Sequence, residues 1–149
     1  MSEMGIREVL RYLPHRYPMV MIDRVLECRP GESLRALKNV TFDEHFFQGH
    51  YPNRPVMPAV LILESMAQAT GILALRSLEK VPDERSVYYF VGIDGARFRR
   101  PVEPGDQLVI DVRLARTTRG VWKVDAEARV DGNLAASAQL MGALREVED

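Results

Sequence analysis

The run AVLILESMAQATGILALRS, residues 59–77, places the strongest limit on how this chain can fold. Its residues are apolar at nearly every angle around a helix, and Pro58 ahead of it suits the first helical position, where no N–H donor is needed. A helix that is apolar all round is buried rather than laid on a surface. We therefore predict a long helix over residues 59–77 that the rest of the chain must cover on every side.

Segments with strand-like patterns are available to provide that cover. Residues 121–130 alternate most clearly, with Trp122 and other apolar residues on one face and charged residues on the other. Because neighbouring strands joined by short turns pair antiparallel, the expected fold is α+β, with about six strands in a curved antiparallel sheet wrapped around one helix. We expect a single domain over residues 1–149. The other strand-like segments are residues 17–28, 32–41, 86–93, 105–117 and 134–146.

Two segments are expected to lie outside the sheet. Residues 4–13 have apolar side chains at helical spacing and precede Pro14, which predicts a short amphipathic helix. Residues 42–57 are expected to form a loop, because the prolines in and next to that segment oppose regular structure.

Composition argues against several classes of function. The net charge is −1 and the pI is near 6.3, so no general basic field favours nucleic acid. Cys28 is the one cysteine, which rules out an internal disulfide and a multi-cysteine metal site. Charges are scattered through residues 1–16, and polar residues interrupt the apolar run 56–75. We therefore expect a cytoplasmic protein with neither a signal peptide nor a membrane span.

His50 and Glu64 are the residues whose surroundings favour chemistry. Glu64 falls in the second turn of the predicted buried helix, where a carboxylate is costly unless paired or protonated. It is either a structural group, bonded to the backbone or an arginine, or a functional one. A lone loop histidine such as His50 is ordinarily structural. Together the two can line one pocket, with Glu64 as a proton donor whose pKa is raised by burial and His50 as the base.

The start of the predicted helix adds a third component. The first N–H groups of a helix have no internal partner, so those at Ala59 and Val60 can receive an oxyanion, assisted by the helix dipole. A base, an acid and an oxyanion site are the groups needed to remove a proton next to a carbonyl and expel a β-leaving group.

Other chemistries have less support. Asp43, Glu44, His45 and His50 lack standard metal-ligand spacing, so no metal is expected. Neither Ser65, predicted to face a different side of the helix from Glu64, nor the strand residue Cys28 has the neighbours of a nucleophile. The chain also has no phosphate-binding glycine loop and no dinucleotide fingerprint, so no cofactor is expected.

Three stretches resemble a known family: LPHRYPMVMIDRV, KNVTFDEHFFQGHYPNRPVMPAVLILESMAQATGILA and FVGIDGARFRRPVEPGDQL. They are similar, in register, to the 3-hydroxyacyl-acyl-carrier-protein dehydratases of bacterial type II fatty acid synthesis. The match is closest to the broad-specificity "Z" type that also serves lipid A synthesis. The resemblance implies a hot-dog fold, a homodimer whose two sheets join, and a trimer of such dimers. It also implies elimination of water, syn or anti, from a (3R)-hydroxyacyl thioester to give the trans-2-enoyl thioester.

The resemblance also implies roles for individual residues. His50, in the family's GH(F/Y)P motif, would remove the C2 proton. Glu64 of the opposite protomer, in the motif LILE(S/A)MAQ, would protonate the departing hydroxyl directly or through a bound water. The pocket would therefore be shared between protomers rather than formed by one chain. Gln68 would hold Glu64 through a helical i, i+4 contact, and the amides at Ala59 and Val60 would hold the thioester oxygen.

Substrate and partner contacts follow from the same resemblance. An apolar tunnel for the acyl chain would be lined by Phe46, Ile62, Met66 and Phe98. Tyr89 resembles the family's tunnel-gate aromatic, although ordinary strand packing accounts for it equally well. The acidic acyl carrier protein would dock on a basic patch, unless that patch is only a solvated strand end. The patch consists of Arg97, Arg99 and Arg100.

Ala59 departs from the family pattern, which usually has glycine at this position. Alanine keeps the N–H group and suits the first turn of a helix. Its methyl group narrows the site, or shifts the loop if the position requires positive φ. We expect activity to be retained.

Two other functions are compatible with the same fold. One is a hot-dog thioesterase, which would hydrolyse the thioester. The other is a non-catalytic acyl-binding module, which the presence of both His50 and Glu64 argues against.

Overall fold

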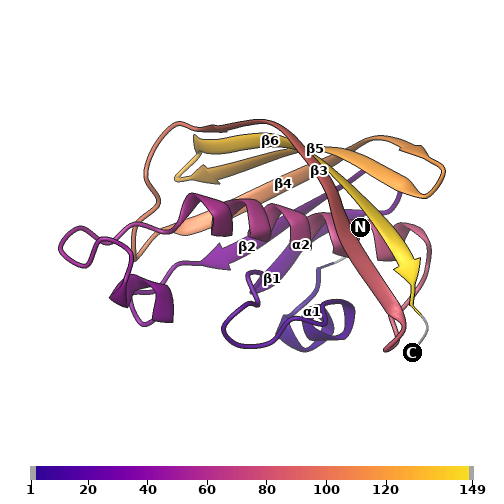
Figure 1. Ribbon diagram of the computed structural model, residues 1–149, viewed down its shortest axis with the longest axis horizontal. Helices are drawn as coiled ribbons and strands as arrows, with labels where there is room; N and C mark the ends of the chain where they lie inside the picture. Colours follow the sequence, from indigo (N-terminus) through magenta and orange to yellow (C-terminus); the bar gives the residue numbers. More distant parts are fainter. Residues whose placement is uncertain (1–2, 148–149) are drawn as a thin grey trace.

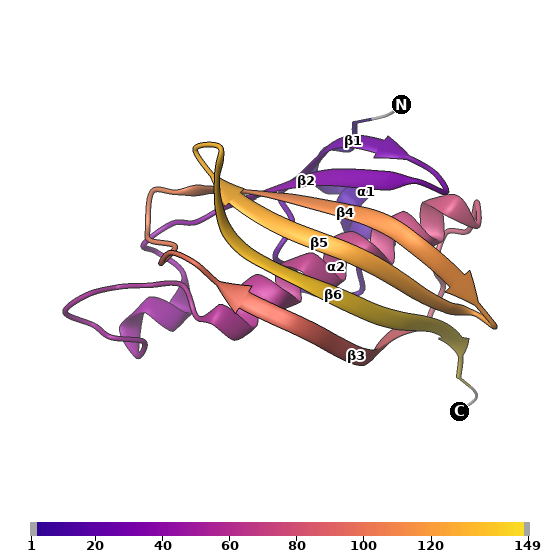
Figure 2. The ribbon, with the colours of Figure 1, turned by 90° about the horizontal axis from the view of Figure 1, so that it is seen from above.

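The computed structural model describes residues 3–147. Its single sheet has the strand order β1-β2-β4-β5-β6-β3, and every neighbouring pair is antiparallel. The sheet curves over α2, which crosses its inner face (Figures 1 and 2). The predicted α+β fold, a long helix wrapped by a six-stranded sheet, is confirmed. The elements are α1 (Ile6–Tyr12), β1 (Arg24–Arg29), β2 (Ser33–Asn39), η1 (His45–Gln48), α2 (Ala59–Ser77), β3 (Ser86–Phe98), β4 (Gln107–Thr118), β5 (Val121–Val130) and β6 (Asn133–Glu146).

The central helix α2 has the predicted bounds and the predicted burial. Pro58, which was expected to be the first helical residue, is instead the N-cap, and Ala59 is the first helical residue. The helix ends where the Leu78 N–H bonds to the Ala74 and Arg76 carbonyls and Glu79 takes a left-handed φ of 52°. α2 packs against β2, β4, β5 and β6, so its apolar residues face the sheet.

The argument that polar residues make this helix too polar to span a membrane is wrong. By length and mean hydropathy, 1.3, α2 would be able to cross a bilayer. However, 67% of the apolar 18-residue stretch of this helix is buried inside the domain, as in the core helix of a soluble protein. Its apolar surface therefore meets the sheet instead of lipid.

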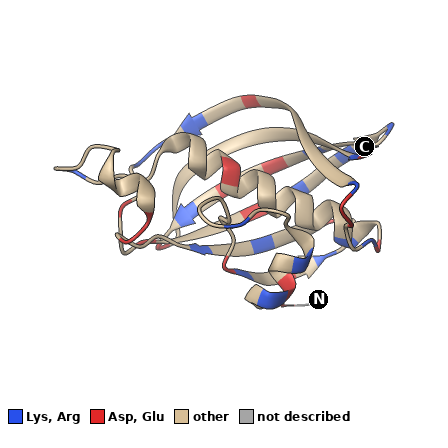
Figure 3. Ribbon diagram, turned by 60° about the horizontal axis from the view of Figure 1, so that its bottom comes forward, with Lys and Arg blue, Asp and Glu red and all other residues tan. Residues whose placement is uncertain are grey.

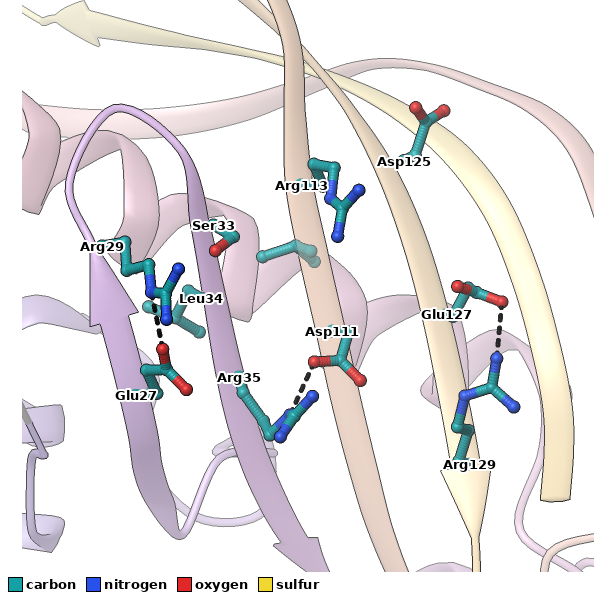
Figure 4. Close-up of a pocket in the computed structure, with 11 residues that line it drawn as sticks. Glu27, Arg29, Ser33, Leu34, Arg35, Asp111, Arg113, Asp125, Glu127 and Arg129 are labelled. Carbon is teal, nitrogen blue, oxygen red and sulfur yellow. Dashed lines mark hydrogen bonds and ion pairs between the residues drawn. The ribbon is translucent and has the colours of Figure 1, made fainter. Parts of the chain in front are cut away.

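The sheet has one apolar face and one charged face. The inward residues of β5 are all buried, as predicted from their alternation: Trp122, Val124, Ala126, Ala128 and Val130. On the outer face, ion pairs join Glu27 to Arg29, Arg35 to Asp111 and Glu127 to Arg129 (Figure 4). Because these pairs are partly or fully exposed, each contributes little to stability, and they mark this face as solvated.

Several segments differ from the sequence-based predictions. The predicted loop 42–57 contains the short 3-10 helix η1, which lies before the first proline of that segment. β3 continues beyond the predicted end at residue 93 to Phe98, with register shifts against β6 between Phe90 and Gly92 and between Asp94 and Arg97. β1 begins only at Arg24, and residues 17–23 form a turn and an irregular segment instead.

The side chain of Tyr88 in β3 packs over Gly142 of β6, in space that a larger residue at position 142 would fill. A Cβ atom added at Gly142 of β6 would collide with the Tyr88 ring and hydroxyl, and one at Gly71 of α2 would touch the same ring. We expect Gly142→Ala to lower the free energy of unfolding by about 1–3 kcal/mol, because the ring has to move. Urea unfolding measures this, and the same substitution in a Tyr88→Leu background should cost much less. Equal costs in both backgrounds would contradict this packing.

Candidate active site

His50 lies in the loop between η1 and α2, held by backbone bonds and by its own ring. Its N–H bonds to the Phe46 carbonyl at 3.0 Å, and its Nδ1 lies 2.8 Å from the Val56 carbonyl oxygen. A carbonyl can only accept, so Nδ1 must carry the proton. In the neutral ring the lone pair is then on Nε2. The loop therefore leaves Nε2 as the free nitrogen of the His50 ring.

The loop that carries His50 is anchored to the core through η1 and the residue before it. Glu44, the N-cap residue, pairs with the buried Lys38 of β2, with 2.6 Å between Nζ and Oε1. Phe47 is buried against the core. After His50 the chain turns at Tyr51, which adopts a left-handed φ of 55°. Such a conformation costs about 1 kcal/mol or more, and it persists because the surrounding contacts fix it.

His50 shares a pocket with the start of α2. Ala59 begins the helix without positive φ, so this position does not require the family's glycine. Within the described residues, the first backbone bonds of α2 start from Leu61 and Ile62, leaving the Ala59 and Val60 amides without a backbone acceptor. The pocket lining is His50, Tyr51, Val56, Met57, Ala59, Ile62, Phe98, Arg99, Arg100, Pro101 and Val102.

Glu64 lines a different pocket, on the side of α2 towards α1 and β3. The predicted contact with Gln68 is present: the Gln68 Nε2 donates to Glu64 Oε1 at 2.9 Å. Gln68 is itself fixed, because Met21 N–H donates to its Oε1 at 2.8 Å and its Nε2 also donates to the Met19 carbonyl. The pocket is mainly apolar, and among the residues that line it are Tyr12, His15, Ala67, Gly71, Tyr88 and Phe90.

His15 is a partner of Glu64 that the sequence analysis missed. Its Nε2 lies 3.3 Å from the same Glu64 oxygen that Gln68 contacts. Neither the backbone nor an arginine, the structural partners considered for Glu64, is among the recorded contacts of its carboxylate. No local signal pointed to His15, because it is 49 residues away in the chain and reaches Glu64 through tertiary packing.

With these contacts the pKa of Glu64 shifts in the direction opposite to the one predicted from the sequence. Burial alone raises the pKa of Glu64, but hydrogen bonds from His15 and Gln68, with the charge of His15 when protonated, lower it below its ordinary value. The prediction of a raised pKa in the free protein is therefore wrong. Figure 3 shows how few charged positions α2 carries along its length, and the recorded contacts of this carboxylate come from His15 and Gln68.

Within one chain, His50 and Glu64 do not line a common pocket. The His50 pocket opens beside the N-terminal end of α2, whereas Glu64 faces the pocket between α1, α2 and β3. The prediction of a single-chain pocket is wrong for this reason. The proline-rich loop carries the imidazole away from the side of α2 on which Glu64 lies.

The remaining predicted residues are divided among several environments. Met66 is fully buried in the core and lines neither of these two pockets. Phe46 packs half-buried against the core, and Val60 is 70% exposed. Tyr89 is exposed and alternates along β3 with Tyr88 and Phe90, which line the Glu64 pocket.

The three arginines and the two rejected nucleophiles are also placed. Arg99 and Arg100 line the His50 pocket, while Arg97 is exposed and donates only to the neighbouring Ala96 carbonyl among the recorded bonds. The Ser65 hydroxyl donates to the Leu61 carbonyl, one turn back, and Cys28 is buried. Among the hydrogen bonds recorded for residues 3–147, none joins either side chain to a basic group.

The central helix wrapped by an antiparallel sheet is the hot-dog fold, and a family model described as a FabA-like domain matches residues 13–139. The chain belongs to this FabA-like family. More specifically, it is one of the 3-hydroxyacyl-[acyl-carrier-protein] dehydratases, which are hydro-lyases.

Relatives support this at high identity over nearly the whole chain. The 3-hydroxyacyl-[acyl-carrier-protein] dehydratase FabZ of Dechloromonas aromatica is 58% identical over 97% of this chain and 100% of that protein. The same enzyme of Nitrosospira multiformis is 55% identical over 97% and 99%. Among solved structures, the dehydratase heterocomplex ApeI:P of Xenorhabdus doucetiae aligns with a TM-score of 0.77 at 19% identity, covering 95% and 91% of the two chains. That likeness shows the fold alone.

Proposed function

We propose that the protein removes water from (3R)-hydroxyacyl chains on acyl carrier protein, giving the trans-2-enoyl thioester for fatty acid synthesis and for lipid A precursors, in the cytoplasm. The family supports the reaction class and a carrier-bound substrate. The observation that carries the residue assignment is the His50 tautomer. Its Nδ1–H is committed to the Val56 carbonyl, so Nε2 is the base that removes the C2 proton.

The thioester oxygen would bind at the start of α2. As the C2–H bond breaks, negative charge develops on that oxygen. The Ala59 and Val60 amides lie at the positive end of the helix dipole, next to the base. Because Ala59 has ordinary helical backbone, its N–H serves this role as glycine would.

The departing hydroxyl would take its proton from Glu64 of the partner protomer, directly or through a bound water. In the free chain the Glu64 carboxyl is ionised, since its pKa is lowered. Burial is nevertheless the largest single influence on that pKa, and it acts upwards. An acyl chain that fills the apolar pocket removes the remaining water, which increases this influence and favours the protonated acid. The C3–O bond then breaks as the proton is transferred and the C2–C3 double bond forms.

A homodimer built through β3 would supply the second half of each site. β3 is an edge strand, so one side of its backbone has no partner strand within the described residues. Its exposed side chains are strongly apolar, among them Tyr89, Phe90, Val91 and Ile93. Joining two such edges would continue the sheet between protomers and cover this surface. Three such dimers would form the hexamer expected from the family.

The acyl chain would leave the shared site along apolar surface. Phe98 and Ile62 line the His50 pocket, and Phe46 packs beside the same loop. Tyr89 on the exposed edge of β3 would reach the chain only from the dimer interface.

The carrier protein would dock beside the His50 pocket. Arg99 and Arg100 line that pocket and Arg97 is exposed on the strand leading to it. An acidic carrier would be attracted to this patch, with its tethered chain entering beside the base.

Charge reversal tests this docking surface. We expect the double substitution Arg99→Glu, Arg100→Glu to raise KM for the carrier-protein substrate about tenfold or more, while turnover of a short pantetheine thioester changes little. Arg113→Glu, on the outer face of β4, is the control and should leave both substrates unaffected. An equal loss with both substrates would place the arginines in the chemistry instead of in docking.

The reaction itself is tested by the mass of the product. Incubation with 3-hydroxyacyl carrier protein should give a thioester that has lost one water and remains attached to the carrier. A free acid would indicate the thioesterase, and an unchanged substrate would indicate the non-catalytic module.

A further inference from the structure

His15 has no assigned role, yet it is the side chain that completes the surroundings of the Glu64 carboxylate. It lies in the segment after α1, whereas Gln68 belongs to α2, so two separate elements converge on one group. His15 Nε2 lies 3.3 Å from Glu64 Oε1, and Gln68 Nε2 lies 2.9 Å from the same atom. None of the hydrogen bonds recorded within the described residues uses Glu64 Oε2.

The backbone around His15 is held in place by Arg16. The guanidinium donates to the Leu13 carbonyl at 2.8 Å, to the His15 carbonyl at 2.6 Å and to the Leu10 carbonyl at 3.2 Å. These bonds satisfy carbonyls at and just after the end of α1. His15 is therefore presented to Glu64 by a braced segment, and its side chain is 31% exposed.

The ring of His15 also has a defined orientation. Its Nδ1 is buried and has no hydrogen-bond partner within the described residues. A proton on Nδ1 would therefore be a buried donor without an acceptor, which is costly. The tautomer with its proton on Nε2 avoids this and donates to Glu64 Oε1.

We propose that His15 is a positioning residue for Glu64: with Gln68 it occupies Oε1 with two N–H donors, so that Oε2 is the oxygen that carries and delivers the proton. An oxygen that accepts two hydrogen bonds is a poor site for a proton of its own. Oε2 remains for the substrate hydroxyl or the bridging water. This inference rests on the proposed acid role of Glu64.

Few other titratable groups face this pair. The pocket lining contributes the phenols of Tyr12 from α1 and Tyr88 from β3, and burial raises the pKa of Tyr88. The neighbouring Arg16 directs its recorded bonds to backbone carbonyls. Within this pocket, Glu64 is therefore the group whose pKa the His15 contact changes, while His50 of the other protomer belongs to the same proposed site.

Two substitutions at His15 separate positioning from simple packing. His15→Gln retains an N–H donor close to the position of Nε2 and is expected to keep most of the turnover. His15→Leu keeps apolar bulk without a donor and is expected to lower kcat about 10- to 100-fold with little change in KM. The kcat/KM profile should also change in His15→Leu, with the limb assigned to Glu64 moving to higher pH, because a contact that lowers its pKa is lost. The thermal midpoint of each variant shows that it is folded.

A double-variant cycle decides whether His15 acts through Glu64. In a Glu64→Gln background, His15→Leu should have almost no further effect on turnover, because its target is already inactive. If Glu64→Gln is fully active, the proposed function fails and this inference fails with it. If Glu64→Gln is inactive while His15→Leu keeps parental turnover and pH profile, only the inference about His15 is overturned. Equal losses in His15→Gln and His15→Leu would likewise contradict a role as donor.

Discussion

His50→Ala is expected to lower kcat by about 10²- to 10⁴-fold, the range associated with loss of a positioned general base. The substitution removes the one imidazole whose Nε2 is left free by the Nδ1 contact to Val56. Stability should change little, because His50 lies half-buried in a loop and is absent from the apolar core. The measurement is formation of enoyl thioester from 3-hydroxyacyl carrier protein, beside thermal unfolding.

His45→Ala is the matched control for this variant. His45 is an exposed histidine in the adjacent η1, and its ring meets only the edges of Tyr17 and Phe46 among the recorded aromatic contacts. It should retain parental turnover. Full activity in His50→Ala would remove the base from the proposed mechanism.

Glu64→Gln is expected to lower kcat by a similar factor, about 10²- to 10⁴-fold. The amide has nearly the shape of the carboxyl and can still accept from His15 and Gln68 through Oε1, but it has no acidic proton to transfer. KM should change less than kcat, since the pocket is otherwise intact. Parental turnover in this variant would mean that Glu64 has a structural role, the alternative that the sequence alone did not exclude.

The same variant has a defined effect on acid stability. Because the folded pKa of Glu64 lies below its ordinary value of 4.5, the carboxylate contributes stability above that pH. This contribution is lost as the pH falls through the lowered pKa. Glu64→Gln should lack this part of the pH dependence of unfolding, which provides a readout independent of catalysis.

Much of the fold follows from local pattern. The helix over 59–77 was predictable because it is apolar all round between Pro58 and the turn at Glu79. β5 was predictable because apolar and charged residues alternate along 121–130, and burial follows the same alternation. η1 was not, since a single 3-10 turn has no periodicity to detect. The full length of β3 was not predicted, because the part beyond residue 93 contains Gly95, which has a φ of 60° and lies at a register shift against β6.

The site was only partly predictable, because its decisive contacts are not local. The Gln68–Glu64 bond follows from helical spacing. The His15–Glu64 contact, however, depends on how the segment after α1 packs on α2. That contact also explains why the predicted pKa direction was wrong. The separation of His50 from Glu64 within one chain arises from the path of the loop 50–58, which sequence distance alone does not reveal.

The most direct test of the shared site is mixing of two inactive variants. Dimers of His50→Ala alone, or of Glu64→Gln alone, carry a defect in every site. If His50 of one protomer works with Glu64 of the other, each mixed dimer has one intact site and one doubly altered site. Unfolding and refolding the two variants together, in equal amounts, should restore about a quarter of parental turnover, since about half of the dimers are mixed. Turnover that stays at the level of the separate variants, with mixed dimers demonstrated by native mass spectrometry, would contradict a site shared between protomers.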